Sequence, residues 1–107
     1  MGFHGNSRQN EKEHHLYAIH DKEEGDVFKY GISDKPIGED GYSQRMREQV
    51  DYLNRAVGWA RYLAEVLIRG IAGNAKARQI EDDFIDAYRE RYGRNPRGNV
   101  KKTSKPN

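Results

Sequence analysis

Two short aromatic and β-branched segments joined by a polar turn restrict the fold of this chain more than any other feature. The first is residues 14–20 (HHLYAIH), the second is residues 26–33 (DVFKYGIS), and residues 21–25 between them are polar and end in a glycine. This pattern is typical of a β-hairpin. The sequence therefore predicts two neighbouring antiparallel strands near the start of the folded part of the chain.

Alternation of side chains along a strand decides which residues of the first segment share a face. Tyr17, His15 and Ile19 are expected on one face. Leu16 and Ala18 are expected on the other. A tyrosine can serve as an acid, a base or a packing residue, so the neighbours of Tyr17 decide its role.

The second segment alternates in the same way. Lys29 and Gly31 are expected on one face, opposed to Phe28 and Tyr30. If Lys29 and Gly31 face the same side as Tyr17, a cationic group and a position without a side chain both lie near the tyrosine.

Histidines gather around the first segment, and imidazole is a common metal ligand. Adjacent His14 and His15 point to opposite faces of a strand, and His20 lies on the side of His14. These side chains are therefore poorly placed to hold one ion. His15 alone remains beside Tyr17, as a candidate auxiliary base.

A loop and a helix are expected after the hairpin. Residues 34–41 carry proline and glycine, and Ser43 is a suitable N-cap for the helix that follows. Apolar residues recur at the helical period, at Met46, Val50, Leu53 and Val57. Arg45, Gln49 and Tyr52 then run along one flank of this stripe.

The second half of the chain contains an ambiguous apolar run and a second helix. Residues 62–71 (YLAEVLIRGI) are compatible with a central strand or with a buried helix, and periodicity alone does not decide between them. Asn74 is a suitable N-cap for a helix that stops at Gly93. The apolar stripe of that helix comprises Ala77, Ile80, Phe84, Ala87 and Tyr88. Glu81 falls at the edge of this stripe and is expected to be half-buried. The other acids of the helix are expected in solvent, at Asp82, Asp83, Asp86 and Glu90.

Composition limits the chemistry open to the chain. Cysteine is absent, which excludes disulfides, thiol catalysis and thiolate metal sites, so a bound metal needs oxygen or imidazole ligands. That favours hard cations such as Mg²⁺. A net charge of +2, from 19 basic and 17 acidic residues, permits nucleic-acid binding without requiring it. No segment approaches the roughly 18 to 20 apolar residues of a membrane span, so we expect a soluble domain without a membrane partner.

Polar ends frame one folded module. Residues 1–13 are interpreted as a flexible leader or linker, residues 14–99 as the domain, and residues 100–107 as a flexible basic tail. Basic residues are usually only solvated, but a patch of them can track a phosphate backbone. We predict nucleic-acid contacts at Arg47, Arg94, Arg97, Lys101 and Lys102.

Several short motifs follow one another in a fixed order. They are His-Leu-Tyr at 15–17, Lys-Tyr-Gly-Ile-Ser at 29–33, the helix arginine Arg45, ARQIEDDFI at 77–85 and Asn-Pro-Arg-Gly-Asn at 95–99. In this order the chain resembles the GIY-YIG and related URI nuclease superfamily. The first two stand where that family carries Gly-Ile-Tyr and Tyr-Ile-Gly-x-Ser/Thr. The last two resemble its A-x-x-x-E-x-x-L-I helix and its closing Pro-x-x-Asn segment.

This resemblance implies a fold and an activity. The implied fold is α+β, with a small central antiparallel or mixed three-stranded sheet flanked by helices. The implied activity is a metal-dependent endonuclease that uses Mg²⁺ or Mn²⁺. Glu81 would bind the metal, Tyr17 would accept the proton of the attacking water, and Arg45 would hold the scissile phosphate.

The chain also departs from the family pattern. When Gly31 is aligned with the family glycine, Lys29 occupies the position of the second tyrosine. Either Lys29 supplies the group needed there, or the strand register differs by one residue; we favour the first. Asn99 is expected to pin the closing segment beside the metal, with Asn95 as the weaker candidate. Gln49 replaces a histidine or tyrosine that some members carry.

The polar leader and basic tail make the chain similar to nuclease modules at the C-termini of secreted bacterial polymorphic toxins. That similarity implies delivery into the cytoplasm of a target cell, cleavage of DNA in preference to RNA, and a cognate immunity protein. Two alternatives stay open. One is a noncatalytic nucleic-acid or protein-binding module on the same fold, and the other is a restriction or repair nuclease.

Overall fold

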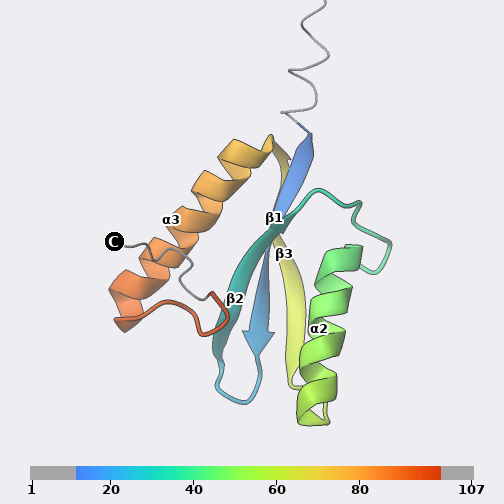
Figure 1. Ribbon diagram of the computed structural model, residues 1–107, viewed down its shortest axis with the longest axis vertical. Coiled ribbons are helices and arrows are strands. Elements are labelled where there is room, and N and C mark those ends of the chain that lie inside the picture. Colours follow the sequence, from blue (N-terminus) through green and yellow to red (C-terminus); the bar gives the residue numbers. More distant parts are fainter. Residues whose placement is uncertain (1–11, 100–107) are drawn as a thin grey trace, which may run out of the picture.

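A computed structural model describes residues 12–99 of the chain as a three-stranded antiparallel sheet between two helices (Figure 1). In chain order the elements are β1 (Glu13–Asp21), β2 (Asp26–Ser33), α2 (Gln44–Val57), β3 (Tyr62–Ala72) and α3 (Asn74–Tyr92). The strand order in the sheet is β2-β1-β3. The predicted α+β class, with a small sheet flanked by helices, is confirmed. β1 begins at Glu13, one residue before the predicted start of the domain.

β1 is the central strand, and its sequence explains why. It is buried along nearly its whole length, from His14 to Ile19, because both of its faces are covered. In β3 buried and exposed residues largely alternate, as expected for a strand with one face packed on a core and the other open to solvent. The apolar run at residues 62–71 is therefore a strand, as one of our alternatives held, but it lies at an edge of the sheet and not at its centre.

The two helices pack on opposite faces of the sheet, and each face has its own apolar core. On the α2 face the buried residues are Tyr17, Ile19, Met46, Val50, Tyr62 and Ala64. On the α3 face they are Leu16, Ile71 and Ala77, with Ile32, Ile80 and Phe84 packed around them. The predicted separation of Tyr17 and Ile19 from Leu16 follows directly from strand alternation.

The alternation predicted for β2 fails at Phe28. Lys29 pairs with Ile19, but His20 pairs with Val27, so Phe28 is an extra residue in a β-bulge. The bulge turns Phe28 into the α2 core, where its ring meets that of Tyr62 at 5.1 Å. Phe28 was expected to face the other side, with Tyr30. The ring of Tyr30 does face α3 and lies 5.4 Å from that of Phe84.

The helix ends agree in part with the sequence. Ser43 is the N-cap of α2, as predicted, and Gly58 ends this helix in the left-handed conformation, with φ of 82°. Val57, assigned to the apolar stripe, is 39% exposed because it sits in the last turn, beyond the edge of the core. α3 is capped by Gly73, and Asn74 is its first residue. Among residues 12–99 no helix is both long enough and apolar enough to cross a membrane.

A buried carboxylate ties the hairpin to distant parts of the chain. The side chain of Asp21 is fully buried and accepts two hydrogen bonds from the Arg61 guanidinium, each of 2.8 Å. Arg97 donates a third, of 2.6 Å, and also binds Asp26 at 3.0 Å. The bonds from Arg61, followed by those from the backbone N–H groups of Glu24 and Glu23, outweigh burial and hold the pKa of Asp21 down at about 2. Asp21 therefore joins the hairpin to the start of β3, through Arg61, and to the C-terminal segment, through Arg97.

The low pKa of Asp21 predicts a loss of stability in acid. A carboxyl whose pKa is lower in the folded than in the unfolded protein stabilises the fold at every pH above its pKa in the unfolded protein. This contribution is lost as the pH falls through its pKa in the folded protein. We expect the free energy of unfolding to decrease as the pH falls from 3.8 to about 2. Chemical unfolding at a series of pH values measures this decrease.

The matched variants are Asp21→Asn and Asp40→Asn. Asp40 forms an exposed ion pair with Arg47, and such pairs contribute little. Asp21→Asn should lower the free energy of unfolding at neutral pH and should reduce its further decrease between pH 3.8 and about 2. Asp40→Asn should change both quantities only slightly. A parent protein equally stable at pH 4 and pH 2 would contradict the assignment.

Candidate active site

The centre of the candidate site is the contact between Tyr17 and Gly31. The two residues are cross-strand partners in β1 and β2. A Cβ added at Gly31 would lie 2.5 Å from both Cζ and Oη of Tyr17, closer than any real side chain allows. The phenol therefore lies across the backbone of β2 at a position where only glycine leaves room. The whole Tyr17 side chain is buried, and its oxygen lies over Gly31 of the outer strand β2.

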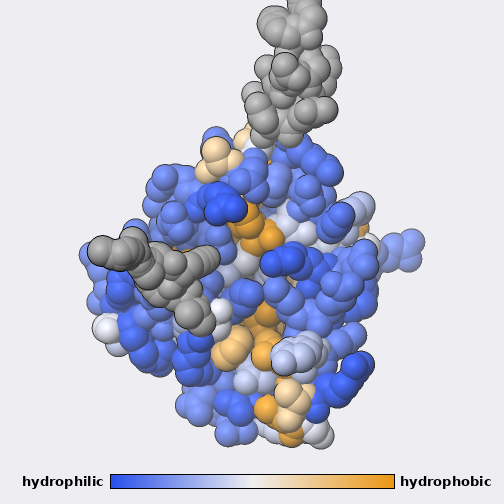
Figure 2. Space-filling model, in the orientation of Figure 1, coloured by the Kyte–Doolittle hydropathy of each residue, from blue (hydrophilic) through white to orange (hydrophobic). Residues whose placement is uncertain are grey.

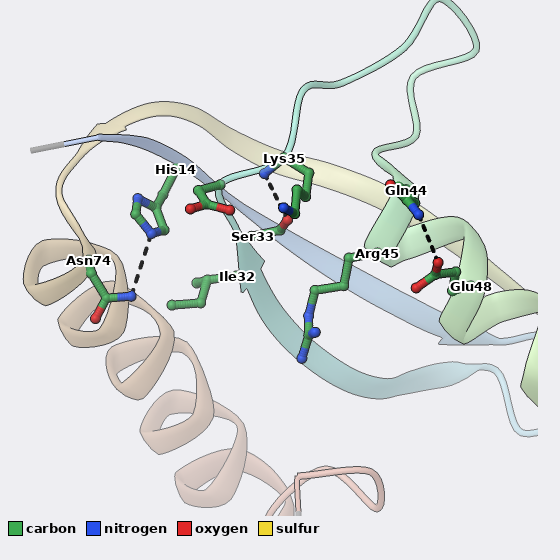
Figure 3. A pocket seen from close by; sticks show the side chains of 9 residues that line it. His14, Ile32, Ser33, Lys35, Gln44, Arg45, Glu48 and Asn74 are labelled. Atoms are coloured by element: carbon green, nitrogen blue, oxygen red, sulfur yellow. Dashed lines mark hydrogen bonds between the residues drawn. The ribbon is translucent and has the colours of Figure 1, made fainter. Parts of the chain in front are cut away.

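The two helices flank this outer strand from opposite sides (Figure 1). Figure 2, in the same orientation, shows apolar surface gathered mainly in a band between the helices, on an otherwise hydrophilic face. Arg45 extends from α2 in front of β2, into an open pocket of about 400 Å³ that Ile32 and Ser33 also line (Figure 3). On α3, Glu81 is half-buried, whereas the neighbouring acids are exposed, as predicted.

Electrostatics link Tyr17 to both helices. Burial raises the pKa of the Tyr17 phenol above its usual value. Arg45 opposes this shift through its charge and by hydrogen bonding, whereas the carboxylate of Glu81 adds to it. The structure thus brings the three polar groups that the sequence singled out into mutual electrostatic range. Their catalytic roles stay predictions.

Gln49 was not among the predicted site residues, yet it contacts Tyr17 directly. The Tyr17 hydroxyl donates a hydrogen bond of 2.7 Å to the Gln49 side-chain oxygen. An amide carries both an acceptor and donors, so Gln49 can also donate to a phenolate if the amide turns over. The signal was present in the sequence, because Gln49 follows Arg45 by one helical turn on the same flank.

Lys29 lies on the Tyr17 side of the sheet, as expected, because it pairs with Ile19. It lines a second pocket, of about 490 Å³, together with Gln49 and Tyr52. Gln49 therefore connects the two residues, because it bonds to Tyr17 and lines the same pocket as Lys29. Glu48 lines both pockets and marks where they adjoin.

His15 lies on the same face as Tyr17, with ring centroids 6.1 Å apart. It is buried, and its Nε2 is 3.0 Å from the hydroxyl of Ser43 at the start of α2. Burial lowers the pKa of His15, and the charge of Arg69 lowers it further. The imidazole is thus kept neutral at physiological pH and bonded to a helix cap. His14 instead contacts Asn74 on the α3 side, as strand alternation predicted.

Asn99 binds the outer edge of β2. Its side-chain oxygen accepts from the Tyr30 backbone N–H, and its amide donates to the Tyr30 carbonyl, both at 2.9 Å. Gly98 donates to the carbonyl of Phe28 at 2.7 Å. The Asn99 side chain therefore satisfies both backbone groups of Tyr30, the residue before Gly31, as a neighbouring strand would. Asn95, the weaker candidate, accepts a bond from Arg89 at the end of α3.

The predicted nucleic-acid contacts are differently placed. Arg97 is engaged with Asp21 and Asp26, and Arg47 with Asp40 at 2.8 Å. Arg94 lies 3.8 Å from Asp26 and 5.7 Å above the ring of Tyr88. The carboxylates neutralise much of the charge that these arginines would offer to phosphates. Lys101 and Lys102 lie outside the described residues.

The donor set suits a hard cation with few protein ligands. Within residues 12–99 no group of three or more His, Asp or Glu side chains could hold a metal ion. Mg²⁺ commonly takes one or two carboxylates and keeps several waters, so a single half-buried glutamate beside a phenol fits it. A site for a softer transition metal would need more nitrogen ligands than this surface offers.

The contact between Tyr17 and Gly31 can be tested by adding one methyl group. Gly31→Ala should destabilise the protein by about 1–3 kcal/mol, the usual cost of overpacking a core, and should displace the Tyr17 ring. Denaturant unfolding measures the first effect, and the ring resonances of Tyr17 report the second.

The control is Gly38→Ala, in a loop where an added Cβ would have no neighbour closer than 3.4 Å. That variant should keep nearly the parent stability. If Gly31→Ala and Gly38→Ala are equally stable and the Tyr17 resonances are unmoved, the described packing is wrong.

Comparison with known proteins supports the resemblance seen in the motifs. Residues 7–93 match the family described as URI fold toxin 2, and this range includes every helix and strand that the structure describes in residues 12–99. Neither the curated proteins nor the solved structures gave a match. The observed sheet with its two helices agrees with the fold in the family's name. The chain therefore belongs to the URI fold toxin 2 family of toxin domains.

Proposed function

We propose that this toxin domain is a nuclease that hydrolyses phosphodiester bonds with the help of Mg²⁺ or Mn²⁺, acting on DNA in preference to RNA. The observation that carries the proposal is the position of the Tyr17 phenol. It lies over Gly31, bonded to Gln49, with Arg45 and Glu81 acting on it from opposite helices. Packing alone would not require this set of polar groups around a buried tyrosine.

The reaction needs a base for the attacking water and cations for the phosphate. Tyr17 is the base in this scheme, and its hydroxyl proton passes to solvent before it accepts a proton from water. Arg45 is a matched partner for phosphate oxygens, because its guanidinium can donate two parallel bonds. Gln49 holds the Tyr17 oxygen in place, and Lys29 supplies a second positive charge on the same face.

Glu81 would hold the metal ion, and the chemistry that such an ion supplies is neutralisation of charge on the phosphate and acidification of bound water. Asn99 supports the site from the edge of β2 through its two bonds to Tyr30. His15, neutral and bonded to Ser43, helps to position the start of α2, and hence Arg45, more readily than it serves as a second base.

Membership of a toxin family supports the biological setting. In this proposal the domain is delivered by a bacterium into the cytoplasm of a target cell and is neutralised in its producer by a cognate immunity protein. Growth arrest on induced expression, relieved by a Tyr17→Phe change, supports the setting. A noncatalytic binding module on the same fold would arrest growth equally with phenylalanine at this position.

Cleavage assays test the roles of Tyr17 and Glu81. Tyr17→Phe should slow cleavage of plasmid DNA or total RNA by about 10²- to 10⁴-fold, the usual contribution of a positioned acid-base group. Glu81→Ala should slow it by at least about 10²-fold, because the metal ion that Glu81 would hold contributes several kcal/mol of charge stabilisation. EDTA should abolish the activity of the parent. The control is Asp82→Ala, because Asp82 is the next residue on α3 but is exposed.

Asp82→Ala should cut at the parent rate. The scheme fails if folded Tyr17→Phe or Glu81→Ala protein cuts as fast as the parent, since neither group would then act in the reaction. Circular dichroism and a thermal melt establish that each variant is folded.

The pH dependence separates a base from a purely structural tyrosine. Because burial raises the pKa of Tyr17, the phenol is mostly protonated at neutral pH, so kcat/KM should increase as the pH rises through the neutral range. Arg45→Ala removes a cation that favours the phenolate. It should therefore shift the profile to higher pH as well as lower the rate.

Arg55→Ala, in the last turn of α2, is the matched arginine control. It should leave the pH profile where it is. A parent profile that is flat from pH 6 to 9 would exclude Tyr17 as the base, provided that the chemical step limits the rate.

A further inference from the structure

A third pocket lies away from Tyr17, between the hairpin turn and the C-terminal half of α3. It encloses about 550 Å³. Four of the residues that line it carry phenyl or phenol rings, namely Tyr30, Phe84, Tyr88 and Tyr92. The proposed reaction uses none of these side chains.

Tyr88 and Tyr92 are held in place by their neighbours and by each other. Tyr88 is buried, and its hydroxyl lies 3.3 Å from both a carboxylate oxygen of Asp26 and a guanidinium nitrogen of Arg94. The ring of Tyr92 rests against that of Tyr88 with a centroid distance of 4.5 Å. Tyr92 is nevertheless 51% exposed. A half-exposed aromatic ring that is supported by a second ring is suited to stacking with another flat ring.

The charge at the rim of this pocket is positive. Asp21 and Asp26 also line the pocket, but both are engaged by Arg97. Arg91 forms no ion pair within residues 12–99, and its guanidinium lies 5.5 Å from the Tyr92 ring centre. Lys22, in the hairpin turn, is an exposed cation on the opposite wall.

A flat apolar surface beside a cation matches a flat ring that carries an anion. We infer that this pocket binds one unpaired nucleotide of a substrate strand, with its base stacked on Tyr92 and its phosphate beside Arg91. The inference rests on the proposed function, because the substrate is a nucleic acid only if the domain is a nuclease. Glu81 and Tyr92 are on the same helix, roughly 16 Å apart along its axis, so one strand of a few nucleotides can reach both.

Binding assays with normal and abasic strands test the base-stacking step. The probes are fluorescently labelled single-stranded DNA and RNA of about 12 nucleotides, and the protein carries Tyr17→Phe to prevent cleavage. Tyr92→Ala should weaken binding about 5- to 100-fold, the effect expected for one stacked base. The same change should have almost no effect on a probe whose sites are abasic. Arg91→Ala should weaken binding to both probes and make it less dependent on salt.

The matched controls come from the end of α2. Trp59 is 49% exposed, close to the value for Tyr92, and Arg55 lies in the last turn of its helix, as Arg91 does. Trp59→Ala and Arg55→Ala should bind like the parent. A loss of affinity from Tyr92→Ala that is equal for normal and abasic probes would overturn the inference, as would no loss at all.

The two proposals fail in different ways. If the parent cuts nucleic acid but Tyr92→Ala binds and cuts normally, the pocket has no part in substrate binding and the proposed function stands. If the parent neither cuts nor binds any probe, the proposed function fails and the nucleotide pocket fails with it. Tighter binding of DNA or of RNA identifies which strand the pocket accepts.

Discussion

The rest of the site depends on the Tyr17 ring lying across the backbone of Gly31. This contact is possible only where two neighbouring strands place a tyrosine opposite a glycine, because any side chain at position 31 would occupy the space of the phenol. It carries a polar group from the central strand, which is buried on both faces, across to the backbone of the outer strand β2. There, groups from both helices can reach it.

The two helices lie on opposite faces of the sheet, and each supplies one of the two charges that act on Tyr17. Arg45 approaches from α2 and Glu81 from α3, and their effects on the Tyr17 pKa have opposite signs. The C-terminal segment completes this edge, with Asn99 bonded to the β2 backbone. Arg97 fastens the same segment to the buried Asp21. The ion pairs around Asp21 thus support a site in which they take no direct part.

Several site features could be predicted from the sequence, and several could not. Strand alternation correctly placed Lys29 on the Tyr17 side, and helical periodicity distinguished the half-buried Glu81 from its exposed neighbours. The bulge at Phe28 was missed, because a bulge changes pairing without a distinct composition. The engagement of Arg97 by Asp21 joins residues far apart in the chain, so no local pattern indicates it. The roles in catalysis still await the assays.

The sequence by itself determined the hairpin, the two helices and the two faces of β1, because these follow from local periodicity and turn residues. Periodicity left residues 62–71 open between strand and helix, so the α+β class was predicted from the family resemblance of the motifs. Only the tertiary structure decided that β3 is an edge strand, that Gln49 bonds to Tyr17, and that several arginines are already paired with acids. Such facts depend on which segments become neighbours after folding. Packing and charge pairing over long sequence separations set them, and no single segment encodes them.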